Sequence, residues 1–387
     1  MSTKLQSPES NKPQKGIARK KITLVVGARP NFMKVAPVLD ALRTIGADRF
    51  DTTLVHTGQH YDKNMSDVFF SDLEMPAPDR FLGVGSGTHA EQTSNVMLAM
   101  EKLFLESRPD LVMVAGDVNS TLATTLVAAK ANIKIAHIES GLRSFDREMP
   151  EEINRIVADE FSQFCFVTEQ SGLKNLKHEG IAQDRVFFVG NTMIDSVVKY
   201  LGKAREHWGS IGKELSAERG AFALITLHRP SNVDFKESLE ALVQLLERMS
   251  EFTSRIIFPI HPRTRKKLEE FNLLERLESN DAIRLIEPVG YLEFLALQDA
   301  AAVILTDSGG VQEETTFLGR PCITLRENTE RPVTVELGSN ELVGNDHAEV
   351  LRLAEIAMKG QWKPSRVPEL WDGAAAKRIV EVLLESL

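Results

Sequence analysis

The sequence contains little cysteine. Among its 387 residues there are two cysteines, Cys165 and Cys322, and each lies inside an apolar run (FCFV and PCITL). Small domains that depend on disulfides are rich in cysteine, so a disulfide framework is excluded and two buried thiols in a reducing compartment are predicted. The chain also lacks a cluster of Cys and His residues with metal-ligand spacing, so no zinc site is expected.

Long apolar segments are absent too. The longest apolar runs have the length of a β-strand, well below the ~18 residues of a transmembrane helix, so no membrane contact is expected. Residues 1–20 are polar and basic and lack the apolar core of a signal peptide, which predicts a disordered tail and a cytoplasmic protein. Positive charge is in deficit, because the formal net charge is −9, and this argues against a nucleic-acid partner.

The length of the chain and its 42% hydrophobic content predict two domains with a core each. Short apolar runs alternate with helical segments throughout, which predicts an α/β fold with two doubly wound parallel sheets. Strands are expected at residues 22–26, 52–56, 111–115, 133–138, 163–168 and 185–189, and then at 222–227, 255–260, 283–286, 303–305 and 322–325.

The predicted domain boundary lies where this alternation weakens, near residues 190–195. We expect the first domain to span residues 21–190 and the second to span residues 195–366. A helix with an apolar face within residues 368–387 is expected to pack back on the first domain.

A charge-dense stretch, residues 137–155 (HIESGLRSFDREMPEEINR), follows the fourth predicted strand. Glu139 comes directly after this strand, and Asp117 comes just after the third. Ligands of open α/β sheets bind outside the carboxyl ends of the strands, so two acids at neighbouring strand ends favour proton chemistry. The alternative is a solvated loop with salt bridges, in which Asp117 caps a helix. Other N-cap candidates there are Asn119, Ser120 and Thr121.

The end of this stretch begins a helix. Pro150 suits the first helical turn, and Glu151 and Glu152 are favourable near the positive end of the helix dipole, so both acids have a structural explanation. We expect one of them to point into the crevice and the other to face solvent. Glu151 and Arg155 are four residues apart and share a helix face.

The loop after the first strand, GARPNFMK, is basic. Arg29 and Lys34 lie where a helix begins, and cations there oppose the helix dipole, so an anionic ligand explains them better than a structural role. The loop lacks the GxGxxG fingerprint, so a nicotinamide cofactor gains no support.

The segment TDSGGVQEE in the second half carries the clearest phosphate signal. Ser308, Gly309 and Gly310 would let backbone N–H groups approach an anion at a helix start. Glu314 lies about one turn further and could accept hydrogen bonds from ribose hydroxyls, so the pattern favours a nucleotide. Arg331 adds a planar cation. The alternative is a plain Gly-rich turn with a capping serine.

Two histidines, His228 and His261, each follow a predicted strand directly. One such residue is often a simple loop residue, but a pair at equivalent strand ends favours a site. A histidine can donate a proton to a phosphate oxygen near neutral pH.

Nine motifs in the same order resemble those of the non-hydrolysing UDP-N-acetylglucosamine 2-epimerases: GARPNFMK, GQH, GDVNSTLA, HIESGLRS, PEEINR, GNTMID, LHRPSN, TDSGGVQEE and RENTERP. They cover essentially the whole chain except the N-terminal tail. The resemblance implies the GT-B architecture, in which two Rossmann-like domains enclose an active-site cleft. It also implies a homodimer.

The activity implied by the resemblance is reversible epimerisation of UDP-N-acetylglucosamine to UDP-N-acetylmannosamine at C2. UDP is eliminated and added back through a 2-acetamidoglucal intermediate, with no cofactor and no metal. Related enzymes act on other UDP-2-acetamido sugars, including diacetamido uronates, and the motifs do not exclude these substrates. A GT-B glycosyltransferase is a further alternative, although it would not explain three acids from separate loops. A non-catalytic nucleotide-sugar sensor is another.

The matched motifs also imply roles for single residues. Proton transfer and assistance to the leaving diphosphate are implied for Asp117, Glu139, Glu151 and His228. Substrate binding is implied for Arg29, Lys34, Phe294, Ser308, Gly309, Gly310, Glu314 and Arg331. Where the family has a glutamine just ahead of Phe294, this chain has Val289, so contacts to uracil there are expected from the backbone alone. The GQH loop differs in spacing from that of members activated by a second substrate molecule.

Overall fold

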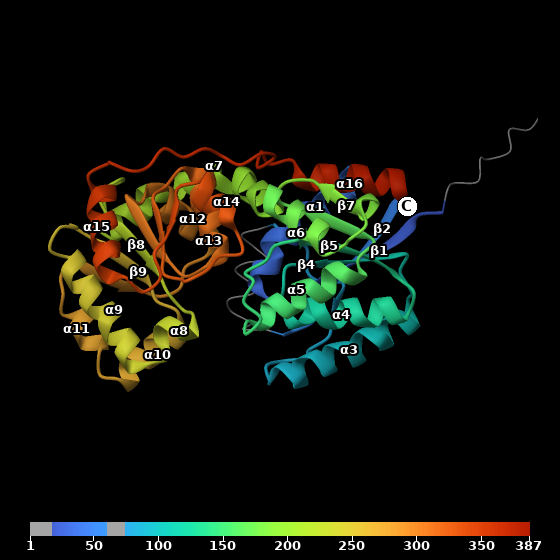
Figure 1. The fold of residues 1–387 in the computed structure, drawn as a ribbon, viewed down its shortest axis with the longest axis horizontal. Helices are drawn as coiled ribbons and strands as arrows, with labels where there is room; N and C mark the ends of the chain where they lie inside the picture. Colours follow the sequence, from blue (N-terminus) through green and yellow to red (C-terminus); the bar gives the residue numbers. More distant parts are fainter. Residues whose placement is uncertain (1–17, 60–73) are drawn as a thin grey trace, which may run out of the picture.

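The computed structural model describes residues 18–59 and 74–387, and these form two lobes that lie side by side (Figure 1). Most of the predicted tail, residues 1–17, lies outside the described residues, and so does the part of the GQH loop after Gln59.

The first lobe is built on a parallel sheet, which we call sheet A. Its strands are β1 (Lys20–Val26), β2 (Phe50–His56), β3 (Arg80–Phe81), β4 (Leu111–Ala115), β5 (Lys134–Ser140), β6 (Phe164–Val167) and β7 (Val186–Phe188). Their order is β3-β2-β1-β4-β5-β6-β7. The apolar run in β1 is buried from Ile22 to Val26, as expected of a parallel strand covered on both faces.

Helices cover both faces of sheet A. They are α1 (Arg29–Thr44), α3 (His89–Glu106), α4 (Asn119–Lys130), α5 (Pro150–Phe161) and α6 (Gln170–His178), and a 3₁₀ turn (Gln183–Arg185) precedes β7. The helix α16 (Ala375–Ser386) comes from the far end of the chain and packs against α1.

The second lobe repeats this design on sheet B. Its strands are β8 (Ala223–Thr226), β9 (Ile256–Pro259), β10 (Ile283–Ile286), β11 (Val303–Thr306), β12 (Cys322–Thr324) and β13 (Asn340–Leu342), in the parallel order β10-β9-β8-β11-β12-β13. The prediction of two doubly wound parallel sheets is confirmed. Two short strands, β3 and β13, were not predicted because neither contains an apolar run.

The helices of the second lobe are α8 (Pro230–Val233), α9 (Lys236–Met249), α10 (Pro262–Glu270), α11 (Leu274–Glu278), α12 (Tyr291–Ala300), α13 (Gly309–Leu318), α14 (Pro332–Glu336) and α15 (His347–Met358). In the described part of the chain, no helix is both long and apolar enough to cross a membrane.

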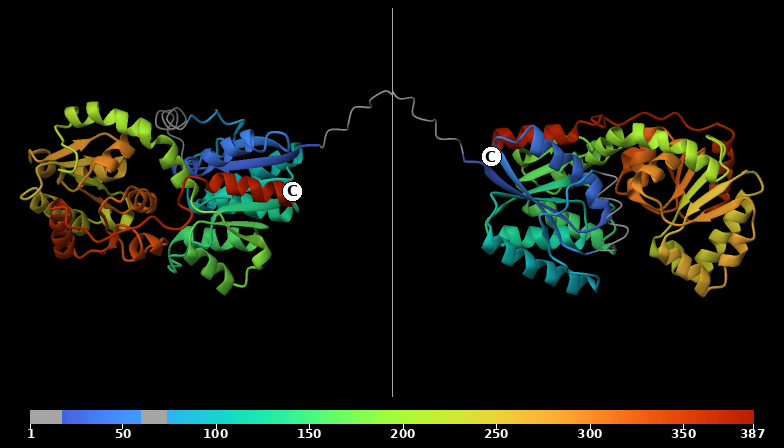
Figure 2. Two further views of the ribbon diagram at one scale, coloured as in Figure 1. Left: turned by 90° about the horizontal axis from the view of Figure 1, so that it is seen from above. Right: turned by 180° about the vertical axis from the view of Figure 1, so that it is seen from behind.

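The chain passes between the lobes twice. The long helix α7 (Thr192–Glu214) packs against α1 and α16 in the first lobe and against α12 and α13 in the second. Its start is capped by the side chain of Asn191, which accepts a hydrogen bond from the N–H of Met193 at 2.9 Å. After α15 the chain runs back from the second lobe to α16 (Figures 1 and 2). The first crossing therefore lies inside a helix.

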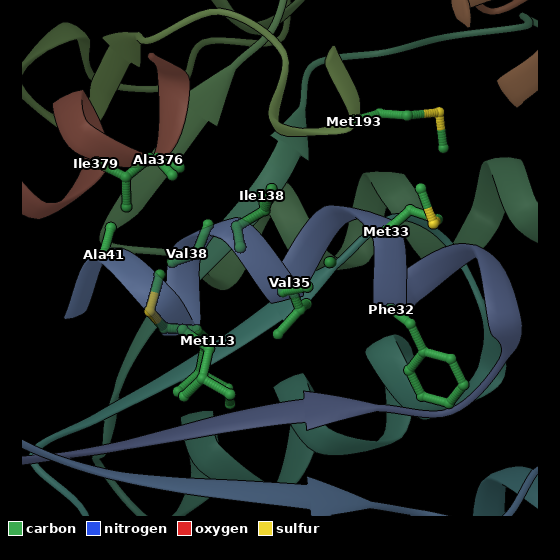
Figure 3. Close-up of a cluster of buried hydrophobic side chains, with 14 of the residues drawn as sticks. Phe32, Met33, Val35, Val38, Ala41, Met113, Ile138, Met193, Ala376 and Ile379 are labelled. Atoms are coloured by element: carbon green, nitrogen blue, oxygen red, sulfur yellow. The ribbon is translucent and has the colours of Figure 1, made fainter. Parts of the chain in front are cut away.

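The core of the first lobe includes residues from both ends of the chain. Phe32 and Val38 of α1 lie in one apolar cluster with Met113, Ile138 and Ile379 (Figure 3). Full burial of one such side chain contributes about 1.5–3 kcal/mol, so α16 adds substantially to this core.

Each sheet contains one cysteine. Cys165 lies in β6 and Cys322 in β12, and both are buried free thiols. Burial raises the pKa of Cys165 to about 12 and that of Cys322 to about 11. The prediction of two buried thiols is confirmed.

Candidate functional site

Each sheet has a point where the strand order reverses. In sheet A the reversal lies between β1 and β4, and in sheet B it lies between β8 and β11. The loops at the carboxyl ends of the strands that flank such a point form ligand crevices. In the first lobe, Lys34 lies in the helix after β1 and Asp117 follows β4. In the second lobe, His228 follows β8 and Ser308 follows β11. These four predicted residues thus lie where this topology expects a ligand.

Glu139 lies within β5 and not after the strand, which corrects the prediction. Its φ is +70°, in the left-handed region that few residues other than glycine adopt. The register between β5 and β6 shifts at this position. Such a β-bulge bends the strand and changes the direction of a side chain, which explains how an acid stands at the end of a buried strand.

The carboxylate of Glu139 forms an ion pair with Nζ of Lys34, and both side chains are buried. Gly116 passes beside this pair with a φ of +63°, and a Cβ atom there would lie 3.1 Å from Nζ of Lys34 and 3.4 Å from Oε2 of Glu139. Glycine suits this position, because it adopts a positive φ without strain and has no Cβ atom to crowd the ion pair. A structural role for Lys34 was disfavoured by its place near the start of a helix, but Glu139 compensates its charge and gives it a structural partner.

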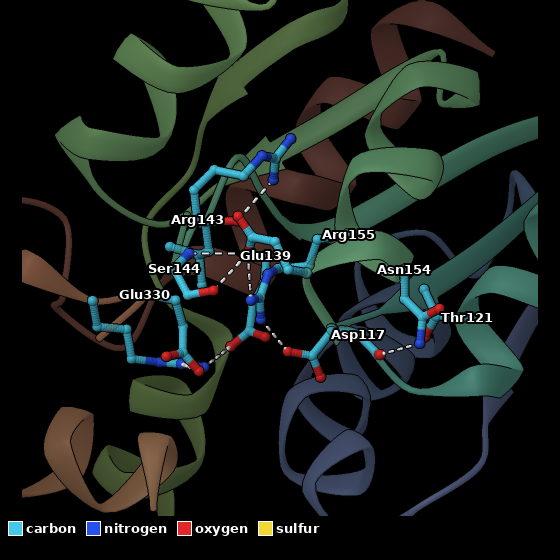
Figure 4. Close-up of polar contacts among 12 residues, drawn as sticks. Asp117, Thr121, Glu139, Arg143, Ser144, Asn154, Arg155 and Glu330 are labelled. Carbon is cyan, nitrogen blue, oxygen red and sulfur yellow. Dashed lines mark hydrogen bonds and ion pairs between the residues drawn. The ribbon is translucent and has the colours of Figure 1, made fainter. Parts of the chain in front are cut away.

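Asp117 stands two residues beyond β4, and Arg155 of α5 pairs with its carboxylate (Figure 4). Its side chain is 24% exposed, so it can reach a ligand. The N-cap of α4 is Val118, which makes no capping hydrogen bond, and the N–H of Ser120 donates instead to Oε1 of Gln59 at 2.9 Å, so Asp117 is not a helix cap. The predicted N-cap candidates were also wrong, because all of them lie inside the helix: Asn119, Ser120 and Thr121.

Arg155 also binds Glu152, with 2.7 Å between Nη2 and Oε2. The Glu152 carboxylate accepts hydrogen bonds from the N–H groups of Ser144 at 2.9 Å and Phe145 at 3.0 Å. Burial opposes ionisation, but these donors and Arg155 hold the pKa of Glu152 below its ordinary value. Glu152 therefore fixes the loop that leads to α5.

Glu151 is half-buried, whereas Glu152 is buried. Glu152 therefore has a structural role and does not face solvent, as one of the two acids was expected to do. Within residues 18–59 and 74–387, Glu151 has no ion pair. Arg155, which shares its helix face, pairs with Asp117 and Glu152. Glu151 is thus the member of the pair that can contact a ligand.

A second buried cluster supports the ends of β4 and β5. Asp159 lies 2.6 Å from Nδ1 of His137 and 2.7 Å from Nη2 of Arg143, and Nε2 of His137 lies 2.8 Å from the carbonyl oxygen of Gly116. Burial opposes ionisation of Asp159, but His137 and Arg143 lower its pKa to about 2. A carboxylate and a carbonyl both accept, so each ring nitrogen of His137 faces a hydrogen-bond acceptor.

In the second lobe, Arg331 is the N-cap residue of α14 and is buried. Its guanidinium lies 2.9 Å from Glu313, 2.9 Å from Glu330 and 3.7 Å from Glu139 of the first lobe. Among the described residues, Oε1 of Glu139 has no hydrogen-bond partner. The guanidinium thus connects the nucleotide-binding segment predicted in one lobe to an acid in the other.

Small residues at the start of α13 leave room for other groups to come close to its backbone. Ser308 is the N-cap residue, but its side chain makes no capping hydrogen bond, so the alternative of a simple capping serine was wrong. A Cβ atom at Gly309 would lie 2.7 Å from Nη1 of Arg331. Gly310 faces Met193 of α7. The first N–H groups of a helix have no acceptor within the helix and favour an anion.

Glu314 lies one turn into α13 and is buried. Its Oε2 accepts a hydrogen bond from Nε2 of Gln298 at 2.6 Å, and burial raises the pKa of Glu314 to about 7. Phe294 of α12 is half-buried and packs in one apolar cluster with Val289.

His228 and His261 lie together, with 5.5 Å between their ring centroids. The Nδ1 atom of His228 is 3.0 Å from Oδ1 of Asp307, a buried residue that precedes Ser308. Arg29 is the first residue of α1, and its side chain lies outside what the structure describes. A pocket of about 480 Å³ between α6, α14 and residues 366–369 contains none of the predicted residues.

Sequence reasoning missed several charged residues of this region: Asp159, Asp307, Glu313 and Glu330. Asp307 could have been found, because it directly follows a strand of the second half as Glu139 was thought to do in the first. Glu313 and Glu330 gave no signal, since each looks like an ordinary helix or loop acid.

The chain matches known proteins over most of its length. The family model described as UDP-N-acetylglucosamine 2-epimerase matches residues 43–384. The UDP-N-acetylglucosamine 2-epimerase of Methanocaldococcus jannaschii is 45% identical over 368 residues, which cover 94% of this chain and 98% of that protein. A Pseudomonas aeruginosa protein named UDP-2,3-diacetamido-2,3-dideoxy-D-glucuronate 2-epimerase is 38% identical over 365 residues, with 94% and 99% covered.

Solved structures agree with these matches. The crystal structure of the M. jannaschii UDP-GlcNAc 2-epimerase in complex with UDP-GlcNAc and UDP has a TM-score of 0.86 at 45% identity and covers 95% of this chain and 100% of that chain. A glycosyltransferase of kitacinnamycin has a TM-score of 0.56 at 15% identity, which is a likeness of fold alone.

Proposed function

The chain belongs to the UDP-N-acetylglucosamine 2-epimerase family, and we propose that it interconverts UDP-N-acetylglucosamine and UDP-N-acetylmannosamine. The chain is an isomerase. Support for this substrate pair comes from the M. jannaschii relative of that name and from its crystal structure, which contains UDP-GlcNAc and UDP.

The proposed reaction is an elimination followed by re-addition. A carboxylate removes the proton from C2 while the bond from C1 to the diphosphate oxygen breaks, and the electron pair left at C2 forms the C1–C2 double bond of a 2-acetamidoglucal. UDP then adds back to C1 and a proton reaches C2 from the opposite face. Inversion therefore needs acid–base groups on both faces of the sugar. The atoms and electrons balance without an oxidant.

The contact between Arg331 and Glu139, at 3.7 Å, is the observation that carries the proposal. Arg331 lies against Gly309 at the start of α13, where a diphosphate would bind. Glu139 and Asp117 are acids at neighbouring strand ends of sheet A. A UDP-sugar with its diphosphate on α13 would therefore present C1 and C2 to these acids, while cations stabilise the charge that develops on UDP.

We propose the following roles for the predicted residues. Proton transfer is assigned to Asp117, Glu139 and Glu151, and donation to the leaving diphosphate is assigned to His228. Binding from the first lobe is assigned to Arg29 and Lys34. Binding of UDP is assigned to Phe294, Ser308, Gly309, Gly310, Glu314 and Arg331. The homodimer, the cytoplasmic location and the domain limits stay predictions.

Incubation with UDP-N-acetylglucosamine in deuterated water tests the reaction. We expect deuterium at C2 of the recovered substrate and of the UDP-N-acetylmannosamine formed, because both protonation steps take hydrogen from solvent-exchangeable groups. Mass spectrometry and NMR of the sugars measure this. Recovery of unlabelled sugar, with turnover only after an acceptor is added, would instead identify a glycosyltransferase.

A related substrate is the second candidate, because the P. aeruginosa relative named for a diacetamido uronate is 38% identical over nearly the whole chain. The same exchange experiment with UDP-2,3-diacetamido-2,3-dideoxy-D-glucuronate decides between the two. A higher kcat/KM for the uronate would assign that substrate to the chain.

The affinity for the UDP-sugar should depend on pH through Glu314. Ribose hydroxyls donate to an ionised carboxylate, and the pKa of Glu314 is about 7, so binding weakens as pH falls through that value. If only the ionised form binds, KM rises about eightfold between about pH 7.5 and about pH 6. Steady-state kinetics across this range give the measurement.

The matched comparison is Glu314→Gln, whose KM should be higher and nearly independent of pH. Burial also raises the pKa of Glu169 to about 7, but Glu169 is present in both the unaltered chain and the variant. The difference between their two pH profiles of KM therefore reports on Glu314 alone. An unchanged pH profile in the variant would remove Glu314 from the proposed ribose contact.

A further inference from the structure

The Asp307 carboxylate lies next to His228 at the reversal point of sheet B. Asp307 follows β11 and His228 follows β8, and these strands are adjacent in parallel register. Asp307 is completely buried. Its Oδ2 accepts hydrogen bonds from the N–H of His228 at 2.9 Å, the N–H of Arg229 at 2.8 Å and Nδ2 of Asn232 at 3.0 Å. These bonds fix the carboxylate in one orientation.

The other oxygen of this carboxylate faces the ring of His228. Oδ1 of Asp307 lies 3.0 Å from Nδ1, whereas the His228 side chain is 41% exposed. Burial opposes ionisation of Asp307, but His228 and the surrounding N–H donors hold its pKa below the ordinary value. An ionised carboxylate can only accept, so Nδ1 must carry the hydrogen and Nε2 is the nitrogen left for a ligand.

The same residue is joined to the phosphate-binding segment. Asp307 is followed directly by Ser308, the N-cap residue of α13, and its carbonyl oxygen accepts a hydrogen bond from Nε of Arg229 at 3.0 Å. A diphosphate at the start of α13 would thus lie beside His228. An imidazole nitrogen is favourable next to a diphosphate only when it carries a hydrogen, so Nε2 would have to donate in such a complex while Nδ1 donates to Asp307.

We propose that Asp307 is a positioning residue for the reaction: its carboxylate holds the Nδ1–H of His228, directs Nε2 at the diphosphate and supplies the countercharge of the imidazolium. The inference rests on the proposed function. Arg229 follows His228 directly, the ring of His261 lies 5.5 Å away, and Asp234 forms an ion pair with Arg263. The carboxylate that faces Nδ1 is that of Asp307.

Nitrogen NMR of protein labelled in histidine tests the arrangement without turnover. In the unaltered chain, the neutral form of His228 should be the Nδ1–H tautomer, which is the minor tautomer of free histidine. With UDP bound near neutral pH, both ring nitrogens should be protonated. The signals are assigned by their loss in His228→Gln. A neutral ring with hydrogen on Nε2 would overturn the proposal, whatever the enzyme catalyses.

Kinetics of variants provide the second readout. Asp307→Asn should lower kcat by about 10- to 100-fold, the cost typical of removing the carboxylate that orients a metal-bound histidine, and should raise KM much less. In a His228→Gln background, the same change should have little further effect on kcat. The control is Asp234→Asn, which removes a neighbouring carboxylate that pairs with Arg263 and should leave kcat unchanged.

Additive losses from Asp307→Asn and His228→Gln would show that Asp307 acts independently of the histidine and would overturn the proposal. If the unaltered chain shows the expected ring protonation with UDP but does not exchange deuterium at C2, the positioning role stands and the proposed reaction fails.

Discussion

Asp117→Asn should lower kcat by about 10²- to 10⁴-fold, the range that a positioned acid–base group contributes. Asparagine has the same shape as aspartate and keeps an oxygen that can accept a hydrogen bond from Arg155, but it cannot take a proton from C2. Arg155 also keeps its bond to Glu152, so the fold of this region should persist. Turnover in both directions and incorporation of deuterium at C2 measure the effect.

The control for this variant is Glu148→Gln. Glu148 lies in the same charge-dense stretch as Glu139 and Glu152, but it is exposed, so its replacement should leave kcat unchanged. Normal turnover of the Asp117 variant would exclude Asp117 from proton transfer. Loss of turnover with retained binding of UDP-sugar would contradict the alternative of a non-catalytic sensor, which needs binding alone.

Arg331→Gln should destabilise the protein by about 3–5 kcal/mol, the usual cost of removing one partner from a buried ionic network. The guanidinium lies near three buried carboxylates, Glu139, Glu313 and Glu330. Burial opposes ionisation of Glu330, and Arg331 is the largest influence that holds its pKa well below the ordinary value. Urea unfolding followed by circular dichroism gives the change in free energy.

The deficit of this variant should grow as pH rises from about 5 to about 8. Loss of Arg331 moves the folded-state pKa values of Glu313 and Glu330 upward from those in the unaltered chain, so the variant loses stability relative to the unaltered chain as pH rises and these groups ionise. Arg352→Gln is the control, because its partner Glu349 lies on the surface and such pairs contribute little. A deficit below about 1 kcal/mol, or one independent of pH, would contradict this account.

The sheets were predictable because burial on both faces demands continuous apolar strands. β4 was placed at its observed limits for that reason, and the parallel order follows from strands that alternate with helices. The acids Asp117 and Glu139 were visible as charged residues where such strands end. Charged residues that directly follow apolar strands therefore predicted the acids at the strand ends of the first sheet.

The partners of these residues were not predictable, since the fold brings them together from distant parts of the chain. Lys34 and Glu139 are 105 residues apart, and Arg331 comes from the other lobe. The bulge at Glu139 gave no signal either, because a positive φ at a glutamate is set by its surroundings and not by its own preference. The sequence therefore favoured an anionic ligand over a protein carboxylate as the partner of Lys34.

The packing of α16 against α1 has a consequence for synthesis on the ribosome. Domains generally fold as units in the order in which they emerge. Here Ile379, Val380 and Leu383 belong to the core of the first lobe, yet they are made after the whole second lobe. The apolar face of α1 that α16 covers therefore has to wait for residues that are made after the second lobe, so the first lobe cannot complete its core before the second lobe has been synthesised.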